Sequence, residues 1–169
     1  MHNLYAPWRA NYLRQSPEQR SKQCVFCQKL QNSTASDNLV FHLTANCAAL
    51  LNRFPYSPGH LLIIPQAHVA DLRQLAMPVL LEMWQLKQLL LQLLFEQLQP
   101  THIEIGFNLG IAAGGGIPGH LHEHLLPRYF QDTQLNFSRQ PVPLNLLDLK
   151  QRLQQGLQKI TPKNSSSKV

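Results

Sequence analysis

The sequence places a histidine at every second position of one short segment, at His120, His122 and His124, directly after a glycine-rich stretch. A period of two residues is that of a β-strand, in which alternate side chains lie on the same face of a sheet. The three imidazoles are therefore predicted to share one face, with neighbouring Cα atoms about 6.5–7 Å apart. Leu121 and Glu123 are predicted to point to the opposite face.

Strand-like and helix-like segments alternate along the rest of the chain. Short β-branched or apolar runs bounded by turn residues predict strands, and longer runs with a period near 3.6 predict helices. The order of strands, helix, strands and helix predicts an α+β domain. The predicted strands are residues 40–43, 48–51, 60–65, 101–108 and 120–127; a single helical turn is predicted at 70–75, and helices at 78–99 and 145–160.

The longer helix, residues 78–99, has more apolar positions than a narrow stripe requires. Trp84 belongs to its predicted apolar stripe, and Lys87 is the one polar residue within that stripe. Leucines at 89, 90, 91, 93 and 94 and Phe95 nearly encircle the helix, so it needs cover on more than one side, either from a second copy or from burial within a monomer. In the C-terminal helix, Gly156 is expected to lower stability.

Length and composition limit the classes of function. A chain of 169 residues with 44% hydrophobic residues suits one domain, here expected over 1–160, with residues 1–23 packed on it and 161–169 as a disordered tail. The net charge of +6 favours anionic partners, but no block of five Lys or Arg indicates a nucleic-acid arm. No run reaches about 18 uncharged apolar residues, so no membrane partner is expected. Three cysteines without an export signal predict the cytoplasm.

The residues alone leave three interpretations of the histidines open: solvated side chains, a metal site, or a nucleophilic imidazole helped by its neighbours. A nucleophilic histidine needs one unprotonated ring nitrogen, a fixed acceptor for the other, and a second group at the leaving oxygen. Gly114, Gly115 and Gly116 would let backbone N–H groups approach an anion. The segment also matches G-x-G-x-x-G, but Pro118 and a strand follow where a dinucleotide fold requires a helix.

Cys24 and Cys27 form a C-x-x-C pair. Such a pair is a redox couple, two unrelated buried cysteines, or half of a zinc site. A thioredoxin-type motif should open a helix after a strand, and the polar residues that precede Cys24 do not fit that pattern. Zinc would need two further ligands, which histidines would supply.

Taken together, these segments resemble the histidine triad (HIT) superfamily. The segment "HLHEHLL" resembles the family signature, and residues 50–69 and 106–129 resemble its central strand pair and active-site segment. Residues 4–13 and "CVFC" are similar to one branch, the zinc-bearing diadenosine tetraphosphate phosphorylases, also called ATP adenylyltransferases. The resemblance covers nearly the whole chain. It implies a half-barrel antiparallel sheet with two main helices, which pairs with a second copy into one continuous sheet.

The resemblance also implies roles for particular residues. His122 matches the nucleophile that attacks a nucleotide α-phosphate, and His124 matches the residue at the phosphate or leaving oxygen. Asn52 and Asn108 match positions that line the nucleotide pocket. The implied ligands of a structural zinc are Cys24, Cys27, His68 and His120. Glu123 departs from the family pattern, because that position is usually apolar or aromatic, and a carboxylate buried there would need a partner.

The reaction implied is phosphorolysis of diadenosine tetraphosphate to ADP and ATP through a nucleotidyl-histidine. Hydrolytic relatives carry a polar side chain four residues before the first histidine, where this chain has Gly116, so inorganic phosphate is the expected acceptor. The alternatives are a hydrolase of dinucleoside polyphosphates or nucleoside phosphoramidates, and a nucleotide-binding regulatory module with little turnover.

Overall fold

The computed structural model describes residues 23–110, 113, 116–129 and 145–161 of the chain. Of the predicted N-terminal extension (1–23) and the predicted tail (161–169), the structure describes only Gln23 and Thr161. Gly114 and Gly115 also lie outside the described residues. In chain order the elements are α2 (Val25–Gln31), β1 (Val40–Leu43), β2 (Cys47–Leu51), β3 (Leu61–Pro65), the 3-10 helix η3 (Leu72–Gln74), α3 (Met77–Leu98), β4 (His102–Phe107), β5 (Glu123–Arg128) and α4 (Leu146–Ile160).

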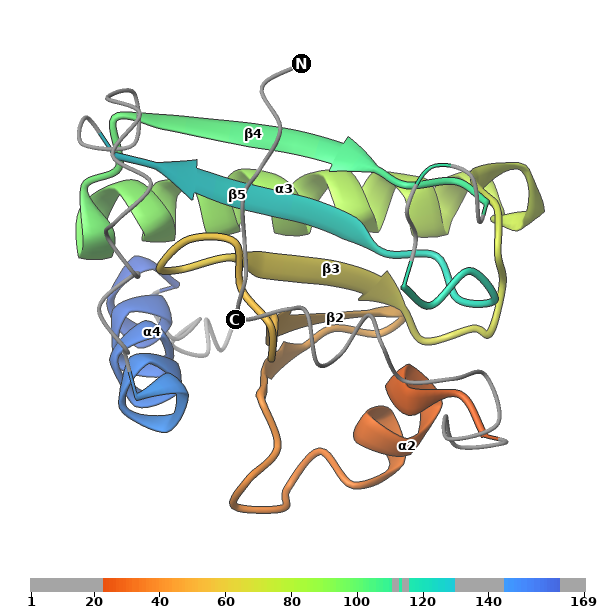
Figure 1. Ribbon diagram of the computed structural model, residues 1–169, viewed down its shortest axis with the longest axis horizontal. Coiled ribbons are helices and arrows are strands. Elements are labelled where there is room, and N and C mark those ends of the chain that lie inside the picture. Colours follow the sequence, from red (N-terminus) through yellow and green to blue (C-terminus); the bar gives the residue numbers. More distant parts are fainter. Residues whose placement is uncertain (1–22, 111–112, 114–115, 130–144, 162–169) are drawn as a thin grey trace, which may run out of the picture.

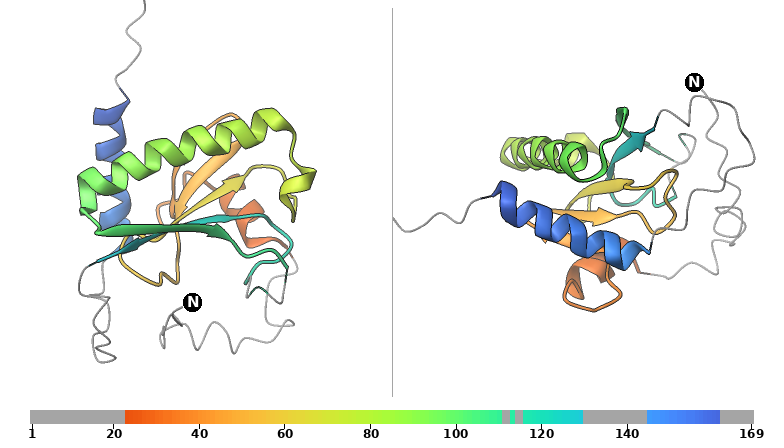
Figure 2. Two further views of the ribbon diagram at one scale, coloured as in Figure 1. Left: turned by 90° about the horizontal axis from the view of Figure 1, so that it is seen from above. Right: turned by 90° about the vertical axis from the view of Figure 1, so that its left-hand side faces the viewer.

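The five strands form one open antiparallel sheet in the order β1-β2-β3-β5-β4. The long helix α3 runs behind β4 and β5, and α4 lies toward the β1 side of the sheet (Figures 1 and 2). The predicted α+β class and antiparallel sheet with two main helices are confirmed. The third helix, α2, was not predicted, and pairing with a second copy stays a prediction.

Apolar side chains are buried on both faces of the sheet, because strands β2 and β3 are apolar at every position. One buried cluster fills the space between the sheet and the helices α3 and α4, and a smaller one fills the space between the sheet and α2. The first includes Cys47, Ala49, Leu51, Leu61, Ile63, Leu90, Leu93, Leu94, Leu125 and Leu153. The second comprises Phe26, Val40, Ala48, Leu50, Leu62 and Ile64.

The last strand is shorter than the sequence predicts. Its ladder begins at Glu123, which faces Ile63 of β3 and Phe107 of β4, so His120 and His122 precede it. The backbone just before the strand is held by the neighbouring loop instead, since the N–H of Leu121 donates to the carbonyl of Val69 at 2.6 Å. The two histidines are nevertheless buried, so they are not the solvated side chains that the sequence left open.

Two expectations about the helices are corrected. Trp84 is 57% exposed, because the buried side of α3 is formed by Met83, Leu86, Leu90, Leu93 and Leu94. Gly156 does more than weaken α4: a Cβ at this position would lie 2.7 Å from Cδ1 of Leu93, so the glycine permits the close contact between α4 and α3. Among the described residues, no helix is both long and apolar enough to cross a membrane.

Candidate active site and candidate metal centre

His122 lies in the segment that enters β5, and its ring is 8% exposed. Its Nδ1 is 2.8 Å from the backbone carbonyl of His120. A carbonyl oxygen only accepts hydrogen bonds, so Nδ1 carries the proton and Nε2 of the neutral ring keeps its lone pair. Burial lowers the pKa of His122, partly opposed by the bond to the His120 carbonyl. The lowered pKa of His122 and the proton held on Nδ1 together leave Nε2 unprotonated near neutral pH, which nucleophilic catalysis requires.

The ring of His124 is linked to His60, the residue that precedes β3. The backbone N–H of Tyr56 donates to Nδ1 of His60 at 3.2 Å, which places the proton of a neutral His60 on Nε2. That Nε2 lies 2.9 Å from Nδ1 of His124 and donates to it. The proton of a neutral His124 is then on Nε2. The side-chain nitrogen of Asn108 lies 3.4 Å from this Nε2, so the Asn108 amide accepts from it only when turned to present its oxygen to the ring. The chain of bonds thus sets His124 as a donor on the side where the substrate is expected.

His60 is a residue that the sequence reasoning missed. It is 1% exposed, and its ring stacks on Tyr56 with centroids 5.5 Å apart. The signal in the sequence was weak: a histidine directly after the Ser-Pro-Gly turn and directly before a buried strand. Its link to His124 depends on the pairing of β3 with β5, which joins residues 64 positions apart.

The other predicted pocket residues are partly brought together. Asn52 has its side-chain nitrogen 3.4 Å from Nδ1 of His60, and its side-chain oxygen accepts from the backbone of Phe54 at 2.9 Å. Asn108 reaches His124 from the end of β4. Gly116 is half-buried, whereas Gly114 and Gly115 lie outside the described residues. The two asparagines therefore lie around the His60–His124 pair.

The four predicted metal ligands come together. One donor atom from each of Cys24, Cys27, His68 and His120 lies within 4.8 Å of all the others. Nδ1 of His120 is 3.3 Å from Sγ of Cys24 and 3.6 Å from Sγ of Cys27, and Nδ1 of His68 is 3.3 Å from Sγ of Cys27. A tetrahedron with zinc bonds of about 2.0–2.3 Å has edges of roughly 3.3–3.8 Å. The donor set and its spacing fit one zinc ion.

The protonation of His120 also suits a metal. Its Nε2 donates to the carbonyl of Pro65 at 2.9 Å, which leaves Nδ1 with a lone pair directed at the thiols. Such a second hydrogen bond fixes the orientation of a metal-binding imidazole. Burial raises the pKa of Cys27, and a hydrogen bond with the Cys24 thiol adds to the effect, so a thiolate at Cys27 needs a cation to stabilise it.

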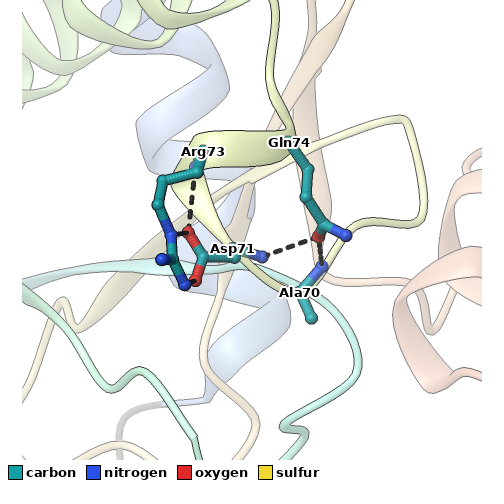
Figure 3. Close-up of polar contacts among 4 residues, drawn as sticks. All are labelled: Ala70, Asp71, Arg73 and Gln74. Carbon is teal, nitrogen blue, oxygen red and sulfur yellow. Dashed lines mark hydrogen bonds and ion pairs between the residues drawn. The ribbon is translucent and has the colours of Figure 1, made fainter.

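The loop that carries His68 is fixed by hydrogen bonds just after it (Figure 3). The side-chain oxygen of Gln74 accepts from the backbone N–H of Ala70 at 2.9 Å and of Asp71 at 3.1 Å. The Asp71 carboxylate in turn accepts from the backbone N–H of Arg73 at 2.9 Å and pairs with its guanidinium at 2.7 Å. The N-cap residue of this capping box, Asp71, is three residues after His68, and the box limits the positions that the imidazole can take.

Helix α2 joins the two centres. Cys24 is its N-cap residue, so the C-x-x-C pair opens a helix, which the sequence analysis did not predict. Phe26, between the two cysteines, is 4% exposed and packs on the rings of His120 and His122, with centroids 5.4 and 5.3 Å apart. The metal ligands therefore hold an aromatic ring against His122.

Glu123 has a partner. Its carboxylate is buried, with a side chain 3% exposed, and lies 2.5 Å from Nζ of Lys87 on α3. The Lys87 ammonium also lies 4.5 Å from the centre of the Trp84 ring. The carboxylate points away from the histidines, as the alternation of the strand predicts, and the expectation that a buried carboxylate needs a partner is confirmed.

One surface cleft lies away from these groups. It has a volume of about 610 Å³ and lies between β1 and α4. Four glutamines of α4 line it together with His42, and β2 and β3 separate it from β5 in the sheet. It brings no predicted site residue together, so the histidines and cysteines remain the candidate site.

Comparison with known proteins places the chain in a family. A family model described as HIT domain matches residues 33–131. A Mycobacterium tuberculosis protein named AP-4-A phosphorylase is 29% identical over 138 residues, covering 79% of this chain and 71% of that relative. A Schizosaccharomyces pombe protein named bis(5'-nucleosyl)-tetraphosphatase (asymmetrical) is 33% identical over 97 residues, which is 57% of this chain and 53% of that relative. Both relatives are named as enzymes, and the prediction of a HIT-family enzyme is confirmed.

Solved structures share the fold. A zinc-bound histidine triad family protein from Mycobacterium smegmatis has a TM-score of 0.66 and 26% identity, covering 82% of this chain and 95% of that one. A hypothetical histidine triad nucleotide-binding protein from Sulfolobus tokodaii has a TM-score of 0.69 and 21% identity, covering 86% and 99%. With the family model matched over more than half of its length and the fold shared with these structures, the chain belongs to the HIT domain family.

Proposed function

We propose that the protein is a nucleotidyl transferase that acts on dinucleoside polyphosphates through a nucleotide covalently attached to His122. The observation that carries the proposal is the 2.8 Å bond from Nδ1 of His122 to the His120 carbonyl, which leaves Nε2 as the free nucleophile. The names of the relatives, an AP-4-A phosphorylase and a dinucleoside tetraphosphatase, support this class of substrate.

In the first step, Nε2 of His122 attacks the α-phosphorus of one nucleotide. A P–N bond forms and the bond from that phosphorus to the bridging oxygen breaks. The remainder of the substrate leaves as a nucleotide; from diadenosine tetraphosphate it is ATP. Nε2 of His124 is placed to donate a hydrogen bond to the leaving oxygen or to the α-phosphate, since its proton is held there by the bond from His60.

The asparagines give the substrate a polar boundary. Asn108 adjoins Nε2 of His124, and Asn52 adjoins His60 on the other side of the pair. Their amides can donate to ribose or phosphate oxygens, which is the role proposed for both. Gly114, Gly115 and Gly116 are proposed to offer backbone N–H groups to the phosphates, an argument that rests on the sequence.

In the second step, an acceptor oxygen attacks the phosphorus bound to His122, and the P–N bond breaks. We propose that inorganic phosphate is the acceptor and that ADP is released. The absence of a polar side chain at Gly116 leaves room for a phosphate ion, and the name of the Mycobacterium tuberculosis relative supports phosphorolysis. Water as the acceptor would give AMP in place of ADP.

The test is the product mixture formed from diadenosine tetraphosphate with and without millimolar phosphate. ADP plus ATP, at a rate that rises with phosphate, supports the proposal. AMP plus ATP, at a rate indifferent to phosphate, would make the protein a hydrolase. No turnover, with the dinucleotide still bound, would favour the binding module. His122→Ala should lower the rate by orders of magnitude, whereas the control His102→Ala, at an exposed position of β4, should not.

We also propose that zinc occupies the site formed by Cys24, Cys27, His68 and His120. When bound, zinc would have a closed set of four protein ligands and therefore a structural role. The zinc-bound Mycobacterium smegmatis structure supports this metal. Two thiolate ligands require reduced cysteines, which fits the cytoplasmic location expected from the sequence.

We infer that residues 1–160 act as one domain that pairs with a second copy. Four large apolar residues of α3 are between 48% and 73% exposed: Met77, Leu81, Trp84 and Phe95. The last three follow Met77 by 4, 7 and 18 positions, so all four lie on one side of the helix. Among the described residues the neighbouring strand β4 is at the edge of the sheet, with no strand beside its outer side, and Ile105 is 46% exposed. A second copy would cover both surfaces.

A further inference from the structure

Two departures from the expected sequence pattern meet in the structure. Glu123 is a carboxylate at a position where the family pattern has an apolar or aromatic residue, and Lys87 is the polar residue within the apolar stripe of α3. Their charged groups are 2.5 Å apart, with side chains 3% and 13% exposed. The indole of Trp84 lies 4.5 Å from the ammonium. The two charges are thus held together in a place with little water.

The position of Glu123 in the strand gives the pair its significance. It is the residue between His122 and His124, and it is also the first residue of the β5 ladder, opposite Ile63 and Phe107. The histidines lie on the α2 face and the carboxylate on the α3 face of the same strand. A displacement of the backbone at Glu123 therefore moves both imidazoles.

We propose that the Lys87–Glu123 ion pair is a positioning device, which fastens the start of β5 to α3 and so fixes the rings of His122 and His124 on the other face. The pair acts through those histidines and touches no substrate, and its effect on turnover rests on the function proposed above. Lys87 and Glu123 are positioning residues in this sense.

A role in stability alone would not explain a charged pair here. Two charges that leave water lose solvation, and buried ion pairs can often be replaced by apolar residues with no loss of stability. What an ion pair supplies beyond an apolar contact is direction, because a short charge-assisted hydrogen bond holds its partners within a narrow range of positions. At this strand end the ladder stops at Glu123 and His122 lies outside it, so the ion pair adds to the bond between Leu121 and Val69 in fixing the segment.

The experiment compares single and double variants. Lys87→Met and Glu123→Leu each leave one buried charge unpaired, so both single variants should melt at lower temperature than the natural protein. The double variant Lys87→Met/Glu123→Leu removes both charges and should recover most of the melting temperature. If the pair positions the histidines, the double variant should still show a kcat lowered by about 10- to 100-fold, with KM changed by less than about threefold.

The matched control is the ion pair between Arg128 and Glu104, which joins the other end of β5 to β4 at 3.0 Å. Glu104 is 60% exposed in its side chain, and Arg128 is the last residue of β5, at the opposite end of the strand from Glu123. The double variant Arg128→Met/Glu104→Leu should retain the natural kcat. A double Lys87/Glu123 variant that recovers both melting temperature and kcat would overturn the proposal.

A second readout does not depend on turnover. In protein labelled with nitrogen-15 in its histidines, the ring signals of His122 and His124 report the hydrogen bonds at Nδ1. The double Lys87/Glu123 variant should move these signals and leave those of His42 and His102 in place. If the natural protein shows no turnover, the proposed function fails and the ring signals alone decide the positioning role. Unmoved signals for His122 and His124 would overturn it.

Discussion

The bond from His60 to His124 offers a sharp test of how the candidate site is organised. Nε2 of His60 is 2.9 Å from Nδ1 of His124, and His60 is 1% exposed. Replacing His60 by phenylalanine keeps the aromatic volume and removes the donor, so Nδ1 of the half-buried His124 loses its hydrogen bond from His60. An unsatisfied buried acceptor costs about 1–3 kcal/mol.

The rate should follow that energy. If the hydrogen bond from His60 stabilises mainly the transition state, in which His124 donates to the leaving oxygen, its loss raises the activation free energy by the same amount, about 1–3 kcal/mol. At 1.36 kcal/mol for each factor of ten, kcat of His60→Phe should fall about 5- to 150-fold. KM should change little, because the bond is not a contact with substrate.

Two smaller variants identify which nitrogen of His60 matters. The side-chain nitrogen of glutamine lies near the position of Nε2 and can donate to His124, whereas that of asparagine lies near Nδ1 and cannot reach it. His60→Gln should therefore retain most of kcat, and His60→Asn should resemble His60→Phe. The assay is the initial rate over a range of diadenosine tetraphosphate concentrations, with melting curves to show that each variant is folded. Equal losses in the Gln and Asn variants, or a natural kcat in His60→Phe, would refute the reasoning.

Four further predictions concern the metal, the packing, the charge state and the assembly. Cys24→Ser should lose about one zinc per chain and melt at lower temperature, because a closed zinc site contributes folding energy; full stability of metal-free protein would contradict it. Gly156→Ala should unfold at lower urea concentration, with a net loss of about 1 kcal/mol in the free energy of unfolding. A Cβ 2.7 Å from Cδ1 of Leu93 costs about 1–3 kcal/mol, and the better helix propensity of alanine returns only about 1 kcal/mol. Equal stability would mean that α3 shifts at little cost in free energy. Burial lowers the pKa of His42, so the unfolded chain binds that proton more tightly and stability should fall as the pH drops below about 6.5. In His42→Gln the free energy of unfolding should fall less over this pH range. Identical curves of stability against pH for the variant and the natural protein would show that His42 does not cause the fall. Light scattering at micromolar concentration should give twice the 19.3 kDa of one chain, and Phe95→Glu should give one chain; a natural protein of 19.3 kDa would overturn the pairing.

Local patterns allowed most of the fold to be predicted. The apolar run of β3 and the long helix α3 lie within one residue of their predicted bounds, because period and turn residues act over a few positions. Helix α2 was missed because it has only seven residues, and its side chains are half apolar and half polar. The start of β5 was misplaced because alternation continues through His120, whereas the ladder also needs a partner strand, and β4 ends at Phe107, opposite Glu123.

The metal cluster shows what a resemblance adds to such patterns. The C-x-x-C pair restricts two ligands by itself, but His68 and His120 are 41 and 93 positions from Cys27, and no local rule joins them. Their convergence depends on two long-range contacts, the packing of α2 on the sheet and the bond from Leu121 to Val69 that holds the His68 loop. The resemblance supplied the ligand set; the geometry then gave the protonation of His120, through Pro65, that a metal requires.

Lys87 and Glu123 mark the limit of reading a sequence one element at a time. Taken singly, each is an error in a pattern: a lysine in an apolar stripe and a glutamate in an apolar slot. A charged residue on one buried face loses its hydration, which costs free energy. Only a residue of opposite charge on the facing element offsets that cost. The two are 36 positions apart, and a strand and a helix must pack before either finds its partner. Paired departures of opposite charge on facing elements are therefore themselves a signal of contact, and here the contact lies directly behind the two histidines proposed to carry the chemistry.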